Sequence, residues 1–194
     1  SATPYRDELF GPHFSNSLFV SDPVHNLVHR MVLQPDGPGF KGVRAPGEAD
    51  RGFRLLDVGS GAGLPGVVIA ICCPQVAVDC VDTVAKKAAF IQQVAATLKL
   101  PNLRGIHARV ENLSQTYDVV SSRAFASLAD FTSLSARALA GEGIWLAMKG
   151  KYPTDELAAL PPTIEVFHVE QLQVPGLDAE RCVLWMRKKE LVGH

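Results

Sequence analysis

The stretch LDVGSGAGLPG, residues 56–66, decides the fold of this chain. It ends a short apolar run that is typical of a buried strand, and it leads into an apolar helical pattern that begins at Pro65. Glycine lets a backbone turn tightly and approach a ligand closely. Doubly wound α/β folds bind nucleotides at such a turn between a strand and a helix. We therefore predict a ligand-binding turn here, and a tight turn without a ligand is the alternative.

The spacing of the glycines excludes two common phosphate-binding motifs. A dinucleotide fingerprint has glycines at relative positions 1, 3 and 6, and the sixth position counted from Gly59 is Leu64. The stretch also lacks the lysine of a P-loop. It has Asp57 two residues before Gly59, and Gly61 and Gly63 after it. This D-x-G-x-G-x-G form resembles motif I of class I S-adenosylmethionine-dependent methyltransferases, whose ligand carries an amino acid moiety rather than a pyrophosphate.

Asp82 strengthens this interpretation, because it ends the second predicted strand, 23 residues after Gly59. A carboxylate in that place can accept hydrogen bonds from both hydroxyls of a ribose. A solvated acid, or one that caps the next helix, is the alternative. With the glycine turn beside it, we predict that Asp82 binds the ribose of an adenosine.

From residue 54 onward, the pattern of apolar residues alternates between strand and helix. Apolar runs predict strands at 55–58, 76–81, 103–108, 117–121 and 144–148, with two closing strands at 164–174 and 182–187. Helical spacing predicts helices at 65–73, 84–98, 128–139 and 155–160. This alternation indicates an α/β fold with a mostly parallel sheet and helices on both faces.

The first 52 residues read differently from the rest. Residues 1–33 carry weak helical signals, and residues 34–52 contain five glycines and three prolines, which are typical of a loop. We expect an N-terminal segment, 1–52, that is helical, ends in a Gly/Pro-rich loop at 34–52, and packs on a core formed by residues 53–194.

Composition excludes several other classes of protein. The chain has 194 residues, 47% of them apolar, and a formal net charge of −1, which argues against a disordered chain. It has no apolar run of the length that crosses a membrane. We predict that Cys72, Cys73, Cys80 and Cys182 are reduced and buried, which fits a cytoplasmic protein. His25 and His29 are four residues apart, as in the H-E-x-x-H motif of zinc proteases, but no glutamate follows His25. No metal site is therefore predicted.

Several longer stretches are similar to a single family. They are LLDVGSGAGLPG (55–66), VDTVAKKAAFIQQVAATLKL (81–100), RVE (109–111), YDVVSSRAFASL (117–128) and MKG (148–150). Together they resemble the glucose-inhibited-division-B type methyltransferases, which methylate ring nitrogen 7 of a guanine in 16S ribosomal RNA. The resemblance implies a Rossmann-like class I fold with a seven-stranded sheet and an antiparallel C-terminal strand. It also implies S-adenosylmethionine as the cofactor.

The resemblance also assigns roles to single residues. Cofactor contacts of motif I fall on Gly59 and Leu64, and the pair that brackets the adenine falls on Val110 and Glu111. Arg123 falls on an arginine of the cofactor site, where it can bind a ligand carboxylate or an RNA phosphate. A structural ion pair is the alternative for Arg123. The predicted cofactor-binding residues are Gly59, Gly61, Gly63, Leu64, Asp82, Val110, Glu111 and Arg123.

The expected reaction is an in-line attack of the guanine nitrogen on the sulfonium methyl group. That nitrogen has a free lone pair and no proton to lose, so no general base is obligatory and positioning can supply the catalysis. Residues 121–124 read SSRA where exocyclic-amine methyltransferases usually carry D/N-P-P-Y, and no cysteine nucleophile stands near. Arg123 and Lys149 are the candidate catalytic residues, in positioning roles.

The small net charge favours a local basic rim over a polycationic surface. Residues 51–110 hold seven basic and three acidic residues, a net charge of +4. The expected partner is 16S ribosomal RNA, at its decoding-region loop, or the small ribosomal subunit, and we expect a monomer. The candidate RNA-binding residues are His13, Lys86, Lys87, Lys149 and Lys151. His13 opens HFSNSL (13–18), where the family has H-x-x-D-S-L, so Asn16 replaces an aspartate.

Two other functions stay open. One is a class I methyltransferase that acts on a small molecule or a protein, which would share the cofactor site but usually adds a lid or substrate domain. The other is a non-catalytic nucleotide-binding module of ribosome assembly, which would explain the fold but not the whole set of cofactor positions.

Overall fold

A computed structural model describes residues 2–4, 17–22, 27–36, 39–44, 52–173, 176 and 178–189. The chain forms two compact units, Ser1–Gly52 and Phe53–His194, which divide it after the same residue as the sequence pattern. The expected packing of the first unit on the second stays a prediction.

The described residues of the first unit form a four-stranded sheet in the order β1-β2-β3-β4, with antiparallel neighbours. The strands are β1 (Ala2–Pro4), β2 (Ser17–Asp22), β3 (Leu27–Asp36) and β4 (Gly39–Arg44). For these residues the predicted helix in 1–33 and loop in 34–52 are wrong. The β-branched valines spread through β2, β3 and β4 favour strands.

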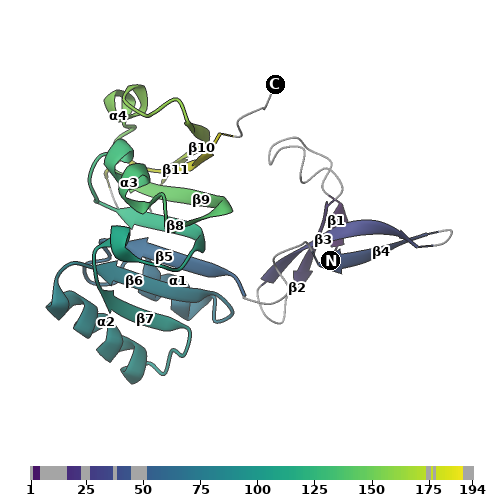
Figure 1. Cartoon of the computed structure of the whole chain (residues 1–194), viewed down its shortest axis with the longest axis horizontal. Coiled ribbons are helices and arrows are strands. Elements are labelled where there is room, and N and C mark those ends of the chain that lie inside the picture. Colours follow the sequence, from purple (N-terminus) through teal and green to yellow (C-terminus); the bar gives the residue numbers. More distant parts are fainter. Residues whose placement is uncertain are drawn as a thin grey trace. The chain divides into compact units, whose positions relative to one another are not determined.

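The described residues of the second unit contain a seven-stranded sheet in the order β10-β11-β9-β8-β5-β6-β7 (Figure 1). The strands are β5 (Arg54–Val58), β6 (Ala77–Asp82), β7 (Leu103–His107), β8 (Tyr117–Arg123), β9 (Leu139–Lys149), β10 (Ile164–Leu172) and β11 (Arg181–Lys188). The strands from β9 to β7 are parallel, whereas β11 runs antiparallel to both β9 and β10. The predicted mostly parallel sheet with an antiparallel C-terminal strand is confirmed.

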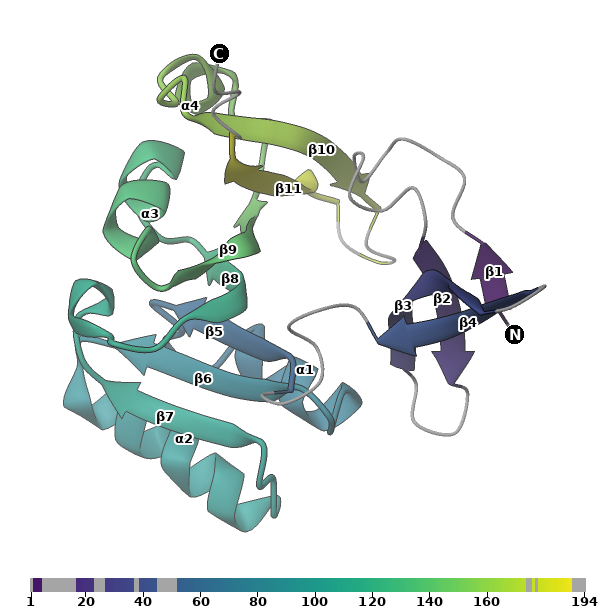
Figure 2. The same ribbon diagram turned by 45° about the vertical axis from the view of Figure 1, so that its right-hand side comes forward.

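Helices cover both faces of this sheet, as Figures 1 and 2 show. They are α1 (Gly66–Cys72), α2 (Ala85–Thr97), α3 (Leu128–Ser135) and α4 (Thr154–Ala158), with a short 3-10 helix at Val110–Asn112. Successive residues of a strand point to opposite faces, so β5 contributes to two cores. Leu55 packs with α1 and α2, whereas Leu56 and Val58 pack with α3.

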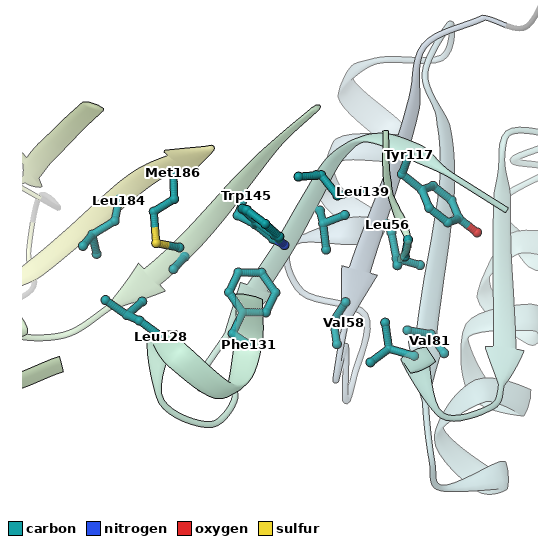
Figure 3. Close-up of a cluster of buried hydrophobic side chains, with 14 of the residues drawn as sticks. Leu56, Val58, Val81, Tyr117, Leu128, Phe131, Leu139, Trp145, Leu184 and Met186 are labelled. Carbon is teal, nitrogen blue, oxygen red and sulfur yellow. The ribbon is translucent and has the colours of Figure 1, made fainter. Parts of the chain in front are cut away.

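The core beneath α3 contains the largest buried side chains, Trp145, Tyr117 and Phe131 (Figure 3). The indole N–H of Trp145 donates to Ser135 Oγ at 2.8 Å, and that hydroxyl donates to the Phe131 carbonyl at 2.6 Å. A buried donor therefore finds an acceptor inside an otherwise apolar cluster. The helix predicted at 128–139 ends at Ser135, because β9 begins at Leu139 and pairs there with Tyr117.

The order of the strands reverses at β5. The chain proceeds from β5 to β6 and β7 on one side, and returns to β8 and β9 on the other. In open α/β sheets, ligands bind outside the carboxyl ends of the strands at such a reversal. The loops that follow β5, β6 and β8 therefore define the place where a ligand site is expected.

Candidate functional site

The turn after β5 depends on glycine at three positions. Gly59, Gly61 and Gly63 have φ angles of +63°, +58° and +88°, in the left-handed region that side chains with a Cβ disfavour. The N–H groups of Gly59 and Ser60 donate to the Val81 carbonyl at 2.9 and 3.3 Å, which ties the turn to the end of β6. The sequence therefore forms a tight, open turn with its backbone at the carboxyl edge of the sheet.

Asp57 holds the start of α1 from below this turn. Its Oδ2 accepts the N–H of Gly66 at 3.0 Å, and its Oδ1 accepts the Ser121 hydroxyl at 3.2 Å. A Cβ at Gly66 would overlap Cys80 Sγ, so helix and sheet approach closely here. Burial raises the pKa of Asp57 to about 6, against hydrogen bonds that lower it. Asp57 thus positions the turn, a role that the sequence analysis did not assign to it.

Asp82 carries the fit to a ribose. Its Oδ2 accepts the N–H of Gly61 at 3.1 Å, and its Oδ1 accepts the N–H of Val84 at 2.9 Å. The second bond ties it to the residue that precedes α2, so the alternative helix-capping role is also present. A carboxylate has about four acceptor positions, which leaves one more on each oxygen for a pair of hydroxyls. The side chain is 6% exposed, so the acceptors lie in a protected place beside the turn.

The residues expected around the adenine follow β7. Val110 is 6% exposed and its side chain packs into the core, so its backbone is the part left for a ligand. Glu111 accepts from Arg109 Nη2 at 3.3 Å, in a pair in which the arginine is largely exposed. The N–H of Ala108 donates to the carbonyl of Asp82 at 3.2 Å, which brings the ends of β6 and β7 together.

The loop after β8 brings an arginine and an aromatic ring to the turn. Arg123 is exposed and forms no hydrogen bond or ion pair with the residues that the structure describes, and its positive charge is near enough to Asp57 to lower the pKa of that carboxyl. Ala124 has a φ of +52°, a strained angle for a residue with a Cβ, and it reverses the chain at once. Phe125 then lies against Gly59, where an added Cβ would stand 2.7 Å from Phe125 Cδ2. Leu64, 39% exposed, lies within the same turn.

The lysines predicted to face RNA have unequal surroundings. Lys86, Lys87 and Lys151 are exposed, and Lys87 Nζ lies 3.6 Å from Asp82 Oδ2. Lys151 lines a hollow of about 840 Å³ with residues of the β10–β11 connection. Lys149 is only 17% exposed and bonds to Glu156, so it is held inside the protein. His13 lies outside the described residues.

The cysteines and possible metal ligands bear on the other expectations. Cys80 and Cys182 are buried as predicted, but Cys72, the last residue of α1, is exposed, and Cys73, which follows it, is only partly buried. The described residues contain no group of three or more His, Cys, Asp or Glu side chains that could hold a metal ion. No helix within those residues has the length and hydropathy needed to cross a membrane.

Comparison with known proteins identifies the family. The GidB family model, described as rRNA small subunit methyltransferase G, matches residues 44–184. The chain belongs to this family. A relative from Polaromonas sp. (strain JS666), named ribosomal RNA small subunit methyltransferase G, is 65% identical over 176 residues, which cover 90% of this chain and 77% of the relative. A relative of the same name from Albidiferax ferrireducens is 61% identical over 180 residues, 89% of this chain and 80% of its own. A model of a domain of unknown function matches residues 1–55.

Solved structures confirm the fold. TrmN from Thermus thermophilus superposes with a TM-score of 0.58 at 20% identity, over 73% of this chain and 46% of its own. A putative methyltransferase from Thermoplasma acidophilum has a TM-score of 0.58 at 14% identity, over 90% of each chain. At such low identities the likeness concerns the fold alone, and it agrees with the class I methyltransferase fold that the sequence predicted.

Proposed function

We propose that this chain transfers the methyl group of S-adenosylmethionine to ring nitrogen 7 of a guanine in the decoding region of 16S ribosomal RNA. One observation carries the proposal. In a member of the methyltransferase G family, the glycine turn and the Asp82 carboxylate meet at the carboxyl edge where the strand order reverses. Relatives that share over 60% of their residues carry a name that states methylation of small-subunit ribosomal RNA.

The residues around the turn fit this cofactor. Asp82 would accept the ribose hydroxyls through its remaining lone pairs, and the backbone of the turn between Gly59 and Gly63 would face the amino acid moiety. The backbone of Val110 and the side chain of Glu111 would border the adenine. Arg123 would bind the ligand carboxylate or an RNA phosphate, because its guanidinium is exposed and forms no hydrogen bond or ion pair with the described residues.

The sulfonium group supplies an electrophilic methyl carbon when the cofactor is bound. The guanine nitrogen attacks with a lone pair and loses no proton, so the chain needs no side chain that accepts one. Its residues instead hold two reactants in line, and this orientation can supply several kcal/mol of the barrier on an order-of-magnitude scale. Arg123 would orient an anionic group, and Phe125 of the same loop lies against Gly59.

The expected partner is 16S ribosomal RNA or the small subunit, met by a monomer in the cytoplasm. Lys86, Lys87 and Lys151 are exposed lysines of the described residues, and α2 begins and β9 ends at the carboxyl edge of the sheet. A basic rim at the mouth of the site would select a structured, anionic substrate. Lys149, which is held by Glu156, is a weaker candidate for direct contact with RNA.

The test adds radiolabelled S-adenosylmethionine and the purified protein to small subunits from a strain that lacks the enzyme. Label is expected in 16S RNA, with strand scission at the modified guanine after borohydride and aniline. Label on protein or on small molecules would support the other class of methyltransferase, and no cofactor binding in calorimetry would support a non-catalytic module.

A matched pair of variants locates the cofactor. Gly59→Asp places a side chain against Phe125 at a positive φ, and it should abolish cofactor binding. Gly141→Asp adds the same side chain to an exposed position with no atom within 4 Å of the new Cβ, and it should bind as the parent does. Equal cofactor affinity in both variants would contradict this placement of the site.

A further inference from the structure

The loop that follows β8 is held by an ion pair outside the predicted cofactor contacts. Lys149, at the end of β9, donates to Oε1 and Oε2 of Glu156 at 3.0 and 2.8 Å, and to the carbonyl of Ala126 at 3.3 Å. Glu156 Oε2 also accepts the N–H of Leu128, the first residue of α3, at 2.7 Å. Two charged side chains therefore connect the end of β9, the loop and the start of two helices.

This pair occupies the groups that each partner could offer to a ligand. The Lys149 side chain is 17% exposed and that of Glu156 is 32% exposed, so the pair is only partly solvated. The ammonium group has three N–H donors, and the three bonds described use them. An RNA phosphate would have to displace Glu156, which would then leave the N–H of Leu128 without its acceptor.

The held segment is the one that shapes the site. It runs from Arg123 to Leu128 and contains the strained Ala124 and the Phe125 ring that lies against Gly59. The same ring meets Phe131 of α3 edge to face, with centroids 6.1 Å apart. A left-handed alanine persists only where its surroundings impose it, and the bonds to Ala126 and Leu128 lie two and four residues beyond it.

We propose that Glu156 and Lys149 are positioning residues of the methyl transfer, which hold residues 124–127 so that Phe125 stays against Gly59 and Arg123 faces the ligand. This inference rests on the proposed function, since it concerns the same site. In this proposal Lys149 holds the loop and does not contact RNA.

The charge of Glu156 gives a test that separates positioning from RNA contact. Glu156→Gln removes a negative charge near the rim, so electrostatics alone would tighten RNA binding. Positioning predicts instead that kcat falls about tenfold, which corresponds to roughly 1.4 kcal/mol of activation free energy. Asp155→Asn makes the same change of charge on the neighbouring exposed residue of α4 and should leave kcat unchanged.

The salt dependence of RNA binding gives a second test. Each phosphate contact that is lost lowers the slope of log K against log salt by about 1. Lys149→Met should therefore lower kcat and keep the slope, whereas Lys151→Met, at an exposed lysine, should lower the slope and raise the KM for RNA. A reduced slope in Lys149→Met, with kcat kept, would overturn the proposal. The double variant Lys149→Met/Glu156→Gln should be no slower than about the worse single variant.

Two readouts do not depend on methylation, so they distinguish failure of this inference from failure of the proposed function. Hydrogen exchange of the peptide that contains Leu128 should accelerate in Glu156→Gln, and calorimetry should show weaker binding of S-adenosylhomocysteine. If Glu156→Gln does not fold, Lys149→Met carries the same measurements. Parental exchange and parental affinity in a folded variant would overturn the positioning role, whatever the RNA assay shows. Absence of methylation by the parent protein would overturn the proposed function alone.

Discussion

The two edges of the parallel sheet use similar polar side chains in opposite ways. At the amino edge, Asp79 accepts from Arg104 at 2.7 and 2.6 Å, from the Tyr117 hydroxyl at 2.7 Å and from Arg54 at 3.2 Å. At the carboxyl edge, Asp82 accepts two backbone N–H groups and has Lys87 Nζ 3.6 Å from its Oδ2. Arg123 forms no hydrogen bond or ion pair with the described residues, and its charge lowers the pKa of Asp57. The polar groups of the first edge bind one another and stabilise the sheet, whereas those of the second edge are the groups that we propose for a ligand.

The pKa values of two buried aspartates, Asp79 and Asp57, are also shifted in opposite directions. Burial raises the pKa of Asp79, but hydrogen bonds from Arg104 and Tyr117 and the nearby positive charges outweigh it and hold this pKa below its usual value. For Asp57 burial prevails, and the pKa rises to about 6. The hydrogen bonds and charges around Asp79 thus stabilise its buried carboxylate. At Asp57, below the turn, they do not offset burial, so ionisation of this carboxyl at neutral pH costs folding free energy.

The largest loss of stability is expected when the polar network around Asp79 is broken. Asp79→Ala removes the acceptor that Tyr117 and two arginines share, and it leaves the buried phenol without a partner. Breaking a buried charged network costs about 3 kcal/mol or more of unfolding free energy. Urea denaturation at pH 7 measures this loss. In calorimetry, the folded variant should bind S-adenosylhomocysteine as the parent does, and a loss of stability below about 1 kcal/mol would show that this network does not stabilise the sheet.

The next effect separates Asp57 from Asp79 by pH. Because the folded pKa of Asp57 lies at about 6, above the unfolded value of 3.8, the folded state binds the extra proton. Asp57 therefore contributes to the stability of the folded state below pH 4. This contribution, about 3 kcal/mol of unfolding free energy, is lost as the pH rises through 6. Asp57→Asn should remove this loss.

Urea unfolding of the parent and of Asp57→Asn at several values between pH 4 and pH 7 measures the difference. The parent should lose stability relative to the variant as the pH rises, whereas the depressed pKa of Asp79 makes a contribution that is lost as the pH falls below its unfolded value. A difference between the two proteins that stays constant with pH would contradict the raised pKa.

A third, smaller effect concerns binding instead of folding. Asp82→Asn keeps the shape of the side chain but removes the charge and one acceptor. It should therefore weaken the binding of S-adenosylhomocysteine about tenfold, or roughly 1.4 kcal/mol of binding free energy. Calorimetry measures the affinity, and the melting temperature without ligand serves as the control. Parental affinity in this variant would assign Asp82 to helix capping alone, through its bond to Val84.

The carboxyl edge could be predicted from the sequence and the amino edge could not. Gly59, Gly61 and Gly63 lie in one short motif, and Asp82 ends the next strand after one intervening helix, so the local pattern was enough. Asp79 appears in the sequence only as a polar residue inside a strand, and its partners Arg104 and Tyr117 lie 25 and 38 residues away. Contacts between strands that are distant in the chain depend on register, which a single sequence does not display.

Two further differences have the same origin, and a third has a local cause. Glu156 was not singled out, because its contact with Leu128 spans 28 residues. Lys149 was predicted as a rim residue because it ends a strand, but the short helix α4 brings a carboxylate to it. In the first 52 residues, weak helical signals were preferred over the valines that favour strands, and the four strands overrule that preference.

The smallest effect compares two arginines of one strand and its flank. Arg104, near the amino end of β7, donates to the buried Asp79. Arg109 lies just beyond the carboxyl end of β7, is largely exposed, and pairs with Glu111 at 3.3 Å. Arg109→Ala should change the unfolding free energy by less than about 0.5 kcal/mol, because an exposed ion pair is screened by water and salt. Arg104→Ala should cost about 1–2 kcal/mol, because it removes charged hydrogen bonds to a buried acceptor. Parallel urea titrations of the two variants measure the difference. Equal costs would mean that the polar groups of the amino edge stabilise the fold no more than those of the carboxyl edge, and the contrast between the two edges would then lose its energetic basis.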